Sequence, residues 1–271
     1  MKPRPFDYVR PDTVEEAVAV LAEHGDDARV LAGGQSLMAM LNLRLADPAV
    51  IVDIARMKEL DAITDLGDKI EIGAAVTQNK LLAWPQLSAK LPLLAAALPF
   101  VGHFQTRNKG TVCGSIAHAD PSSEIPLSLA VLSGEVVLRS KKGERVLKAN
   151  DFQQDMMTTA REPDELITAV RFPVIATRGV AFREVARRHG DFAIVAIAVV
   201  MDGNTARLGV GGMTGRPAVR SIAADGVAEA IAALAEELEG YEDLHASAKM
   251  RRDLLRRIGP VVIEEARRCA A

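Results

Sequence analysis

Cysteine is nearly absent from this sequence, and the shortage excludes several kinds of metal protein. Only Cys113 and Cys269 occur among 271 residues, whereas a zinc site or an iron–sulfur cluster commonly takes about four Cys or His ligands. The five histidines form no His-x-x-x-His or His-x-His spacing. We therefore expect no metal site and no disulfide scaffold in this chain, and any iron–sulfur chemistry would belong to a partner.

The sequence also lacks a strong charge of either sign and any long apolar run. Its 33 basic and 36 acidic residues give a formal charge of −3, which provides no global field for nucleic acid or an anionic membrane. No apolar run approaches the roughly 20 residues of a spanning helix. The first residues, 1–8, lack the apolar core of a signal peptide. These absences predict a cytoplasmic protein that binds no nucleic acid and does not span a membrane.

What the chain does have is enough apolar residues, 49%, to bury one large core or two ordinary ones. Thr13 and Glu16 have capping-box spacing and indicate a helix that ends at Gly25. Strands and helices alternate up to about residue 56, and a second lobe with short strands begins after it. The strongest later signals are strands at 69–74, 135–138, 166–172, 192–200 and 206–210, and helices at 78–84, 88–98, 227–240 and 246–271, the last with an interruption at 259–260.

A Pro-containing segment at residues 173–179 indicates a domain boundary. We therefore predict a first domain of residues 1–175, with lobes of about 1–56 and 57–175, and a second domain of residues 176–271. In the second domain, Asp202-Gly203-Asn204 between two apolar runs is typical of a β-hairpin. The following helical segments predict an antiparallel sheet packed against helices.

One glycine loop lies between a short strand and a helix-like segment. Its residues are Ala32, Gly33, Gly34, Gln35 and Ser36. Adjacent glycines let the backbone approach a ligand closely, and a following helix start favours an anion. The pattern suits a phosphate, although a plain strand-to-helix turn gives the same residues.

A second loop of the same kind lies in the densest polar stretch, residues 101–126. That stretch has no helical or alternating apolar pattern, which predicts a long functional loop. Within it, Thr111-Val112-Cys113-Gly114-Ser115 follows a Lys109-Gly110 corner, about 75 positions after the first loop. Two such loops could hold the two phosphates of a dinucleotide from opposite sides. Neither loop has the Gly-x-Gly-x-x-Gly or Gly-x-x-x-x-Gly-Lys-Ser/Thr pattern of other nucleotide folds.

Taken together, these motifs resemble the FAD-binding medium subunit of molybdenum hydroxylases, the family of xanthine dehydrogenase and aerobic carbon monoxide dehydrogenase. The resemblance covers essentially the whole chain. The matching segments are Ala32-Gly33-Gly34-Gln35-Ser36-Leu37, residues 42–48, Gly110-Thr111-Val112-Cys113-Gly114-Ser115, Ala117-His118-Ala119-Asp120-Pro121 and Arg188-His189-Gly190-Asp191-Phe192-Ala193.

This resemblance implies an α+β protein: a two-lobed FAD-binding domain of the p-cresol methylhydroxylase type, followed by a small α+β domain. FAD would be bound non-covalently, with its pyrophosphate between the two loops. The expected cofactor-binding residues are Arg29, Ala32, Gly33, Gly34, Gln35, Ser36, Leu37, Thr111, Val112, Cys113, Gly114, Ser115, His118, Asp120, Glu124, Ile167 (or Thr168), Arg183 and Phe192, the last near the isoalloxazine ring.

The sequence departs from the family at two positions. The family often has glycine where Cys113 stands and proline where Phe104 stands. A cysteine is tolerated in a phosphate loop if its side chain points away from the ligand, and we interpret Cys113 as a small buried residue with a redox nucleophile as the alternative. His118, Asp120 and Glu124 could also form a metal cluster, but Asp120-Pro121 more simply starts a turn.

A basic stretch near the C-terminus, residues 249–257, admits two interpretations. It carries five basic residues and one acidic residue, which could indicate nucleic acid. The interleaved Leu254, Leu255 and Ile258 favour a solvated helix face or a surface for a partner subunit.

The function implied by the resemblance is electron transfer in a multi-subunit dehydrogenase. FAD in this chain would take electrons from a small subunit with [2Fe-2S] clusters, and a large molybdenum-pterin subunit would oxidise the substrate, in a heterotrimer expected to dimerise. The flavin performs the redox chemistry, so we assign no catalytic residue. Two alternatives stay open: a self-standing FAD-dependent oxidoreductase with its own substrate pocket, and a non-catalytic nucleotide-binding assembly protein.

Overall fold

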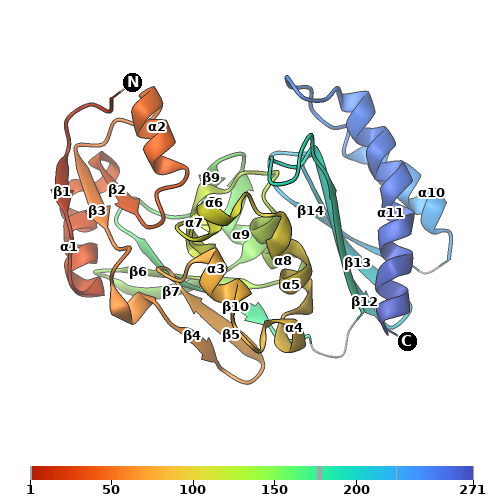
Figure 1. The fold of residues 1–271 in the computed structure, drawn as a ribbon, viewed down its shortest axis with the longest axis horizontal. Helices are drawn as coiled ribbons and strands as arrows, with labels where there is room; N and C mark the ends of the chain where they lie inside the picture. Colours follow the sequence, from red (N-terminus) through yellow and green to blue (C-terminus); the bar gives the residue numbers. More distant parts are fainter. Residues whose placement is uncertain (1, 176–178, 224, 271) are drawn as a thin grey trace.

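The computed structural model describes residues 2–175, 179–223 and 225–270, and they form three side-by-side units (Figure 1). The first lobe lies at one end, the second lobe in the middle and the C-terminal sheet with its helices at the other end. This arrangement agrees with the predicted α+β class and with a two-lobed domain followed by a smaller one. The predicted boundary segment, residues 173–179, begins at the end of strand β10 (Leu166–Pro173), and its residues 176–178 lie outside the described residues.

The first lobe is a small parallel sheet with the strand order β1-β3-β2. Helix α1 begins where the sequence predicted, because the Thr13 side chain accepts a hydrogen bond from the Glu16 N–H at 3.2 Å. Its buried face is Val14, Ala17, Val18 and Leu21. The elements are β1 (Asp7–Val9), α1 (Val14–His24), η1 (Gly25–Asp27), β2 (Ala28–Leu31), α2 (Leu37–Leu43) and β3 (Val50–Asp53).

The second lobe is built on a five-stranded sheet with the order β4-β5-β10-β6-β7 and is covered by short helices. Trp84 packs partly buried against its core. The elements are η2 (Lys58–Leu60), β4 (Ile63–Asp65), β5 (Lys69–Gly73), α3 (Gln78–Leu82), α4 (Leu87–Lys90), α5 (Pro92–Ala97), η3 (Leu98–Phe100), α6 (Phe104–Arg107), α7 (Val112–His118), α8 (Glu124–Val131), β6 (Glu135–Ser140), β7 (Gly143–Lys148), α9 (Ala149–Phe152), β8 (Gln153–Asp155), β9 (Thr158–Thr159) and β10 (Leu166–Pro173).

Two sequence predictions in this lobe are wrong. The polar stretch at 101–126 is not a long loop, since it contains α6, α7 and the start of α8. These helices escaped detection because α6 and α7 are very short and α8 is buried on all sides, so that it has no apolar stripe. The helix predicted at 88–98 is divided into α4 and α5, because Pro92 cannot continue a helix and starts a new one.

The C-terminal domain is an antiparallel sheet with the order β11-β12-β13-β14. Strand β12 is buried on both faces: Ala196, Ala198 and Val200 join the core of the N-terminal domain, while Val195 and Ile197 face the helices α10 and α11. The sheet therefore lies between the second lobe and the two helices (Figure 1). The elements are β11 (Val180–Val185), β12 (Val195–Asp202), β13 (Thr205–Gly211), β14 (Ala218–Ala223), α10 (Val227–Glu237) and α11 (Ala248–Ala270).

Helix α11 differs from its prediction in two ways. It continues through Pro260, because a proline removes one backbone donor without preventing the turns on either side. Its basic stretch is not solvated throughout, since Arg251 is 1% exposed. None of the helices in the described part of the chain is long and apolar enough to cross a membrane.

Arg251 joins the end of the sheet to helix α11. Its guanidinium donates to the carbonyl oxygens of Gly212 at 2.6 Å, Ile194 at 2.5 Å and Tyr241 at 3.0 Å, and to the Asp243 carboxylate at 2.5 Å. It also lies 4.1 Å from the centroid of the Tyr241 ring. The burial of this charge is compensated by a full set of partners.

Candidate cofactor site

The two glycine loops predicted from the sequence are brought together in the structure. A side chain on Gly33 would place its Cβ 2.1 Å from the Lys109 carbonyl oxygen and 2.6 Å from the Gly110 Cα. The backbone of the first loop, residues 32–36, therefore lies directly on the corner before the second loop, residues 111–115. Only a residue without a Cβ permits this approach.

The first loop presents backbone donors to its surroundings. Gly34 has a φ of 70°, in the left-handed region, and its carbonyl accepts the Met38 N–H at 3.1 Å, which starts α2. Within the described residues, the N–H groups of Gly33, Gly34, Gln35 and Ser36 donate no hydrogen bond. Such a run of free N–H groups before a helix suits an anion.

The second loop is fixed by its neighbours in the lobe. The Thr111 hydroxyl caps α7 by accepting the Gly114 N–H at 2.9 Å. The Gln78 N–H donates to the Gly110 carbonyl at 2.8 Å, and the Val112 N–H donates to the Val76 carbonyl at 3.1 Å. The turn between β5 and α3 thus holds this loop at the junction of the two lobes.

Cys113 points away from the loop surface and into the core. It is 3% exposed, and its thiol donates to the Ile72 carbonyl at 3.4 Å. Burial raises the pKa of this thiol well above its ordinary value, so that the reactive thiolate is disfavoured. This placement agrees with the interpretation of Cys113 as a small buried residue.

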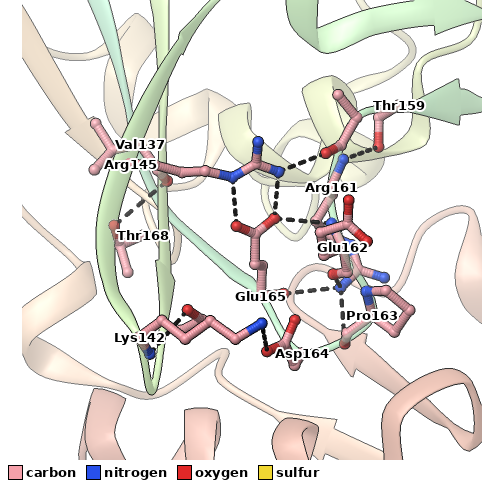
Figure 2. Close-up of polar contacts among 12 residues, drawn as sticks. Val137, Lys142, Arg145, Thr159, Arg161, Glu162, Pro163, Asp164, Glu165 and Thr168 are labelled. Atoms are coloured by element: carbon pink, nitrogen blue, oxygen red, sulfur yellow. Dashed lines mark hydrogen bonds and ion pairs between the residues drawn. The ribbon is translucent and has the colours of Figure 1, made fainter.

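Two arginines, one from each lobe, influence one another electrostatically. Arg29 on β2 donates to the carbonyls of Asp26 and Ala28, both at 2.8 Å. Arg161 follows β9 and donates to the Glu165 carbonyl at 2.8 Å, and Figure 2 shows the Glu165 carboxylate bound in turn by Arg145. Burial and the charge of Arg29 lower the pKa of Arg161. Each lobe therefore contributes a positive charge to this region.

Glu124 is a buried carboxyl at the first position of α8, 7% exposed. Burial raises its pKa to about 7; the nearby Asp120 carboxylate adds to the increase and the Arg107 guanidinium opposes it. Asp120 accepts the Ser122 N–H at 2.8 Å, which is the turn expected from Asp120-Pro121. In the described residues, no group of three His, Cys, Asp or Glu side chains could hold a metal ion.

The remaining predicted residues lie on several different elements. Leu37 is the first residue of α2 and His118 the last of α7. Ile167 is buried in the core on β10. Phe192, 64% exposed, follows a segment in which the His189 ring lies 6.0 Å from that of Phe100 in the second lobe.

Arg183 does not lie with the other predicted cofactor-binding residues. It lies on β11 with its guanidinium bound to Glu265 of α11, Nε to Oε2 at 2.8 Å, on the sheet face turned away from the second lobe. Its neighbour Glu184 points the other way, because successive strand residues alternate between faces.

Sequence reasoning missed two charged residues of this region. Arg161 is largely buried in the second lobe and its pKa is lowered by burial and by the charge of Arg29, and Glu184 of the C-terminal sheet has a buried Oε2 without a hydrogen-bond partner within the described residues. The alternation of Phe182 and Glu184 on one strand could have placed Glu184 on an inner face. No local pattern indicates Arg161, since its environment is formed by segments distant in the sequence.

Comparisons with known proteins agree with this geometry. The family described as the FAD binding domain in molybdopterin dehydrogenase matches residues 4–175. Subunit alpha of the 6-hydroxypseudooxynicotine dehydrogenase complex of Paenarthrobacter nicotinovorans is 37% identical, over 94% of this chain and 92% of its own. Subunit beta of caffeine dehydrogenase from a Pseudomonas species is 40% identical, over 74% of this chain and 69% of its own.

A solved structure matches over the full length. A chain of carbon monoxide dehydrogenase from Hydrogenophaga pseudoflava superposes with a TM-score of 0.94 at 32% identity and covers 100% of both chains. The resemblance drawn from the two loops is thereby confirmed. This chain belongs to the family of the FAD binding domain in molybdopterin dehydrogenase and is a flavoprotein component of a molybdenum-containing oxidoreductase.

Proposed function

We propose that this chain binds FAD between its two glycine loops and serves as the electron-transfer subunit of a molybdenum hydroxylase. Electrons would arrive from a [2Fe-2S] subunit and leave to an external acceptor, while a large molybdenum-pterin subunit oxidises the organic substrate. The observation that carries the proposal is the backbone contact of Gly33 with Lys109 and Gly110, which joins two loops far apart in the sequence.

The residues at the junction fit a dinucleotide. The free N–H groups of residues 33–36 and the capped start of α7 would bind the pyrophosphate, and Arg29 would contact the nucleotide. The exposed Phe192 ring offers a surface for the isoalloxazine. The proposed contacts are Arg29, Ala32, Gly33, Gly34, Gln35, Ser36, Leu37, Thr111, Val112, Cys113 (through its backbone), Gly114, Ser115, His118, Asp120, Glu124, Ile167 and Phe192.

FAD supplies the redox chemistry when bound, and this chain supplies binding and orientation. Further relatives are named as medium chains or medium subunits of dehydrogenases and of a hydroxylase, which supports a complex of a large, a medium and a small chain. A dimer of that heterotrimer and a cytoplasmic location stay predictions from the sequence.

The test is the FAD content of the purified full chain and of the variant Gly33→Val. We expect the unchanged chain to be yellow and the variant to lose most of its FAD, because the valine side chain cannot fit beside the Lys109 carbonyl. Gly203→Asn is the control: Gly203 has a φ of 58°, which asparagine tolerates, and an added Cβ would meet nothing within 4 Å.

Three outcomes separate this proposal from the alternatives. Colourless protein that FAD cannot reconstitute would contradict it, as would full FAD occupancy in folded Gly33→Val. Yellow protein that oxidises an organic substrate without other chains would favour the self-standing oxidoreductase.

A further inference from the structure

The connection between β11 and β12 carries Phe192 at its tip and rests on the second lobe. We call residues 187–192 the turn tip. A Cβ on Gly190 would lie 2.8 Å from the Gly102 carbonyl oxygen and 2.8 Å from the His103 ring. The backbone of the turn tip therefore lies directly on the segment that precedes α6, and only glycine permits this approach.

Phe100 supplies the aromatic part of the same contact. Its ring centroid lies 5.5 Å from that of Phe182 on β11 and 6.0 Å from that of His189 in the turn tip. Both pairs are tilted, at 45° and 59°, and lie within the separation at which aromatic rings attract one another. Phe100 thus contacts both the strand that leads into the turn and the turn itself.

The segment that bears Phe100 is fixed by Arg107 of α6. The Arg107 guanidinium donates to three carbonyl oxygens of residues 99–102, at 2.9 to 3.5 Å. The same short helix ends at the corner of the second glycine loop, where the Gly110 N–H donates to the Thr106 carbonyl at 2.7 Å. Helix α6 therefore supports both Phe100 and the glycine corner of the proposed cofactor site.

The turn tip itself is closed only by local hydrogen bonds. Within the described residues, the Asp191 N–H donates to the Arg188 carbonyl at 3.1 Å, and the Asp191 carboxylate accepts from Arg187 and Arg188 at 3.2 to 3.3 Å. These bonds give the tip a shape but do not attach it to the second lobe. Its place on that lobe depends on the packing of His189 and Gly190.

We propose that Phe100 is a positioning residue for the flavin: by packing on the turn tip, it holds Phe192 beside the isoalloxazine ring. The proposal rests on the proposed function, because it assumes that FAD binds between the loops with its ring at Phe192. Phe192 is 64% exposed and follows Gly190 by two residues, so that it moves with the tip. A tip that is already held in place need not be ordered when FAD binds, which would cost conformational entropy.

The first measurement needs no FAD and follows trypsin cleavage after Arg187 and Arg188 by mass spectrometry. These side chains are 53% and 77% exposed, and cleavage after Lys142 in the exposed β6–β7 turn is the internal reference. Phe100→Leu should raise the rate at the tip about fivefold over the reference, because the loss of an aromatic pair favours the open tip. Phe100→Tyr, which keeps the ring, and Phe104→Leu, at an exposed ring of α6, should cleave as the unchanged chain.

The second measurement is a titration of the full chain with FAD, which gives the dissociation constant and the visible spectrum of the bound flavin. Phe100→Leu should weaken binding about fivefold and shift the flavin spectrum toward that of free FAD, and Phe100→Tyr should restore both. In a Phe192→Leu background, Phe100→Leu should have no further effect on the spectrum, because Phe100 acts through Phe192.

The outcomes separate this inference from the proposed function. Equal acceleration of cleavage at the tip and at Lys142, no acceleration at all, or additive spectral effects of the Phe100 and Phe192 substitutions would refute the role of Phe100 while FAD binding stands. Absence of FAD binding in the unchanged chain would refute the proposed function, and with it the role of Phe100 toward the flavin. The cleavage rates would still decide whether Phe100 holds the turn tip.

Discussion

An ionisable side chain lies against each face of the C-terminal sheet, and the two differ in how completely their hydrogen bonds are made. On the side of α11, Arg251 has donors matched to three carbonyls and a carboxylate. On the side of the second lobe, Glu184 has a buried oxygen without a donor. A buried charge whose hydrogen bonds are all made stabilises a single arrangement of the chain. A buried carboxyl oxygen without a donor can still be stabilised by a proton or by a ligand. The contacts of Arg251 thus stabilise the docking of α11, whereas the inner face retains an unsatisfied carboxyl oxygen.

The largest effect expected from this comparison is at Arg251. Replacement by methionine, which has a similar length, removes the donor that Arg251 supplies to Asp243 Oδ2 and to three carbonyl oxygens. We expect a loss of about 3–5 kcal/mol in the free energy of unfolding, measured by chemical denaturation. Arg257→Met, at an exposed residue of the same helix, should lose far less. Equal losses in the two variants would show that the partners of Arg251 are not what holds α11.

A smaller effect is expected from pH on the stability of the FAD-free chain. The pKa of Glu184 rises from an ordinary 4.5 to about 8 on folding, so that the folded state holds more protons between these values. Stability is therefore fully present below about pH 4.5 and falls as the pH rises toward 8. Solvent screening of a half-buried group reduces the change, and we expect about tenfold in the unfolding equilibrium constant.

Glu184→Gln should flatten this profile between pH 5 and 8, because the amide carries no titrating proton. Unfolding curves at four or more pH values would measure it. If the stability of the variant falls with pH as steeply as that of the unchanged chain, the pH dependence comes from other groups. Glu124 would then be the first residue to replace.

The smallest effect is expected at Arg183, the immediate neighbour of Glu184. Its ion pair with Glu265 is largely exposed, and Arg183→Gln should reduce the free energy of unfolding by less than about 1 kcal/mol. Its FAD content should equal that of the unchanged chain, as measured by flavin absorbance. A loss of FAD would return Arg183 to the cofactor site and remove the distinction between the faces.

Much of the fold was predictable because its signals are local. The cap at Thr13, the hairpin around Gly203 and the alternation of glycine loops with strands each depend on a few adjacent residues. The two glycine loops were also predictable, since a pair of adjacent glycines indicates a backbone conformation or a close approach that few other residues allow. The family resemblance added the prediction that both loops bind the same FAD, which neither loop indicates by itself.

The rest was not predictable, because it depends on contacts between distant segments. Helix α8 is buried by the C-terminal sheet together with the helices of the second lobe, so that its sequence carries no amphipathic pattern. Arg251 belongs to a run of basic residues that is otherwise typical of a solvated surface, and its burial depends on Asp243 and on carbonyl oxygens from distant segments. The burial of the Glu184 Oε2 at the domain interface likewise requires knowledge of how the two domains dock.

The contact between Gly33 and the Lys109-Gly110 corner also bears on the order of folding. About 75 residues separate its two sides, and it exists only when both lobes have formed and docked. Contacts between residues this far apart in the sequence form late in folding, because bringing the two segments together costs loop-closure entropy before the contact stabilises the chain. FAD would therefore meet a finished binding site only in the fully docked chain. By mass action it would stabilise that state against every partly folded one, which makes cofactor loading a check on complete folding before the chain joins its partners.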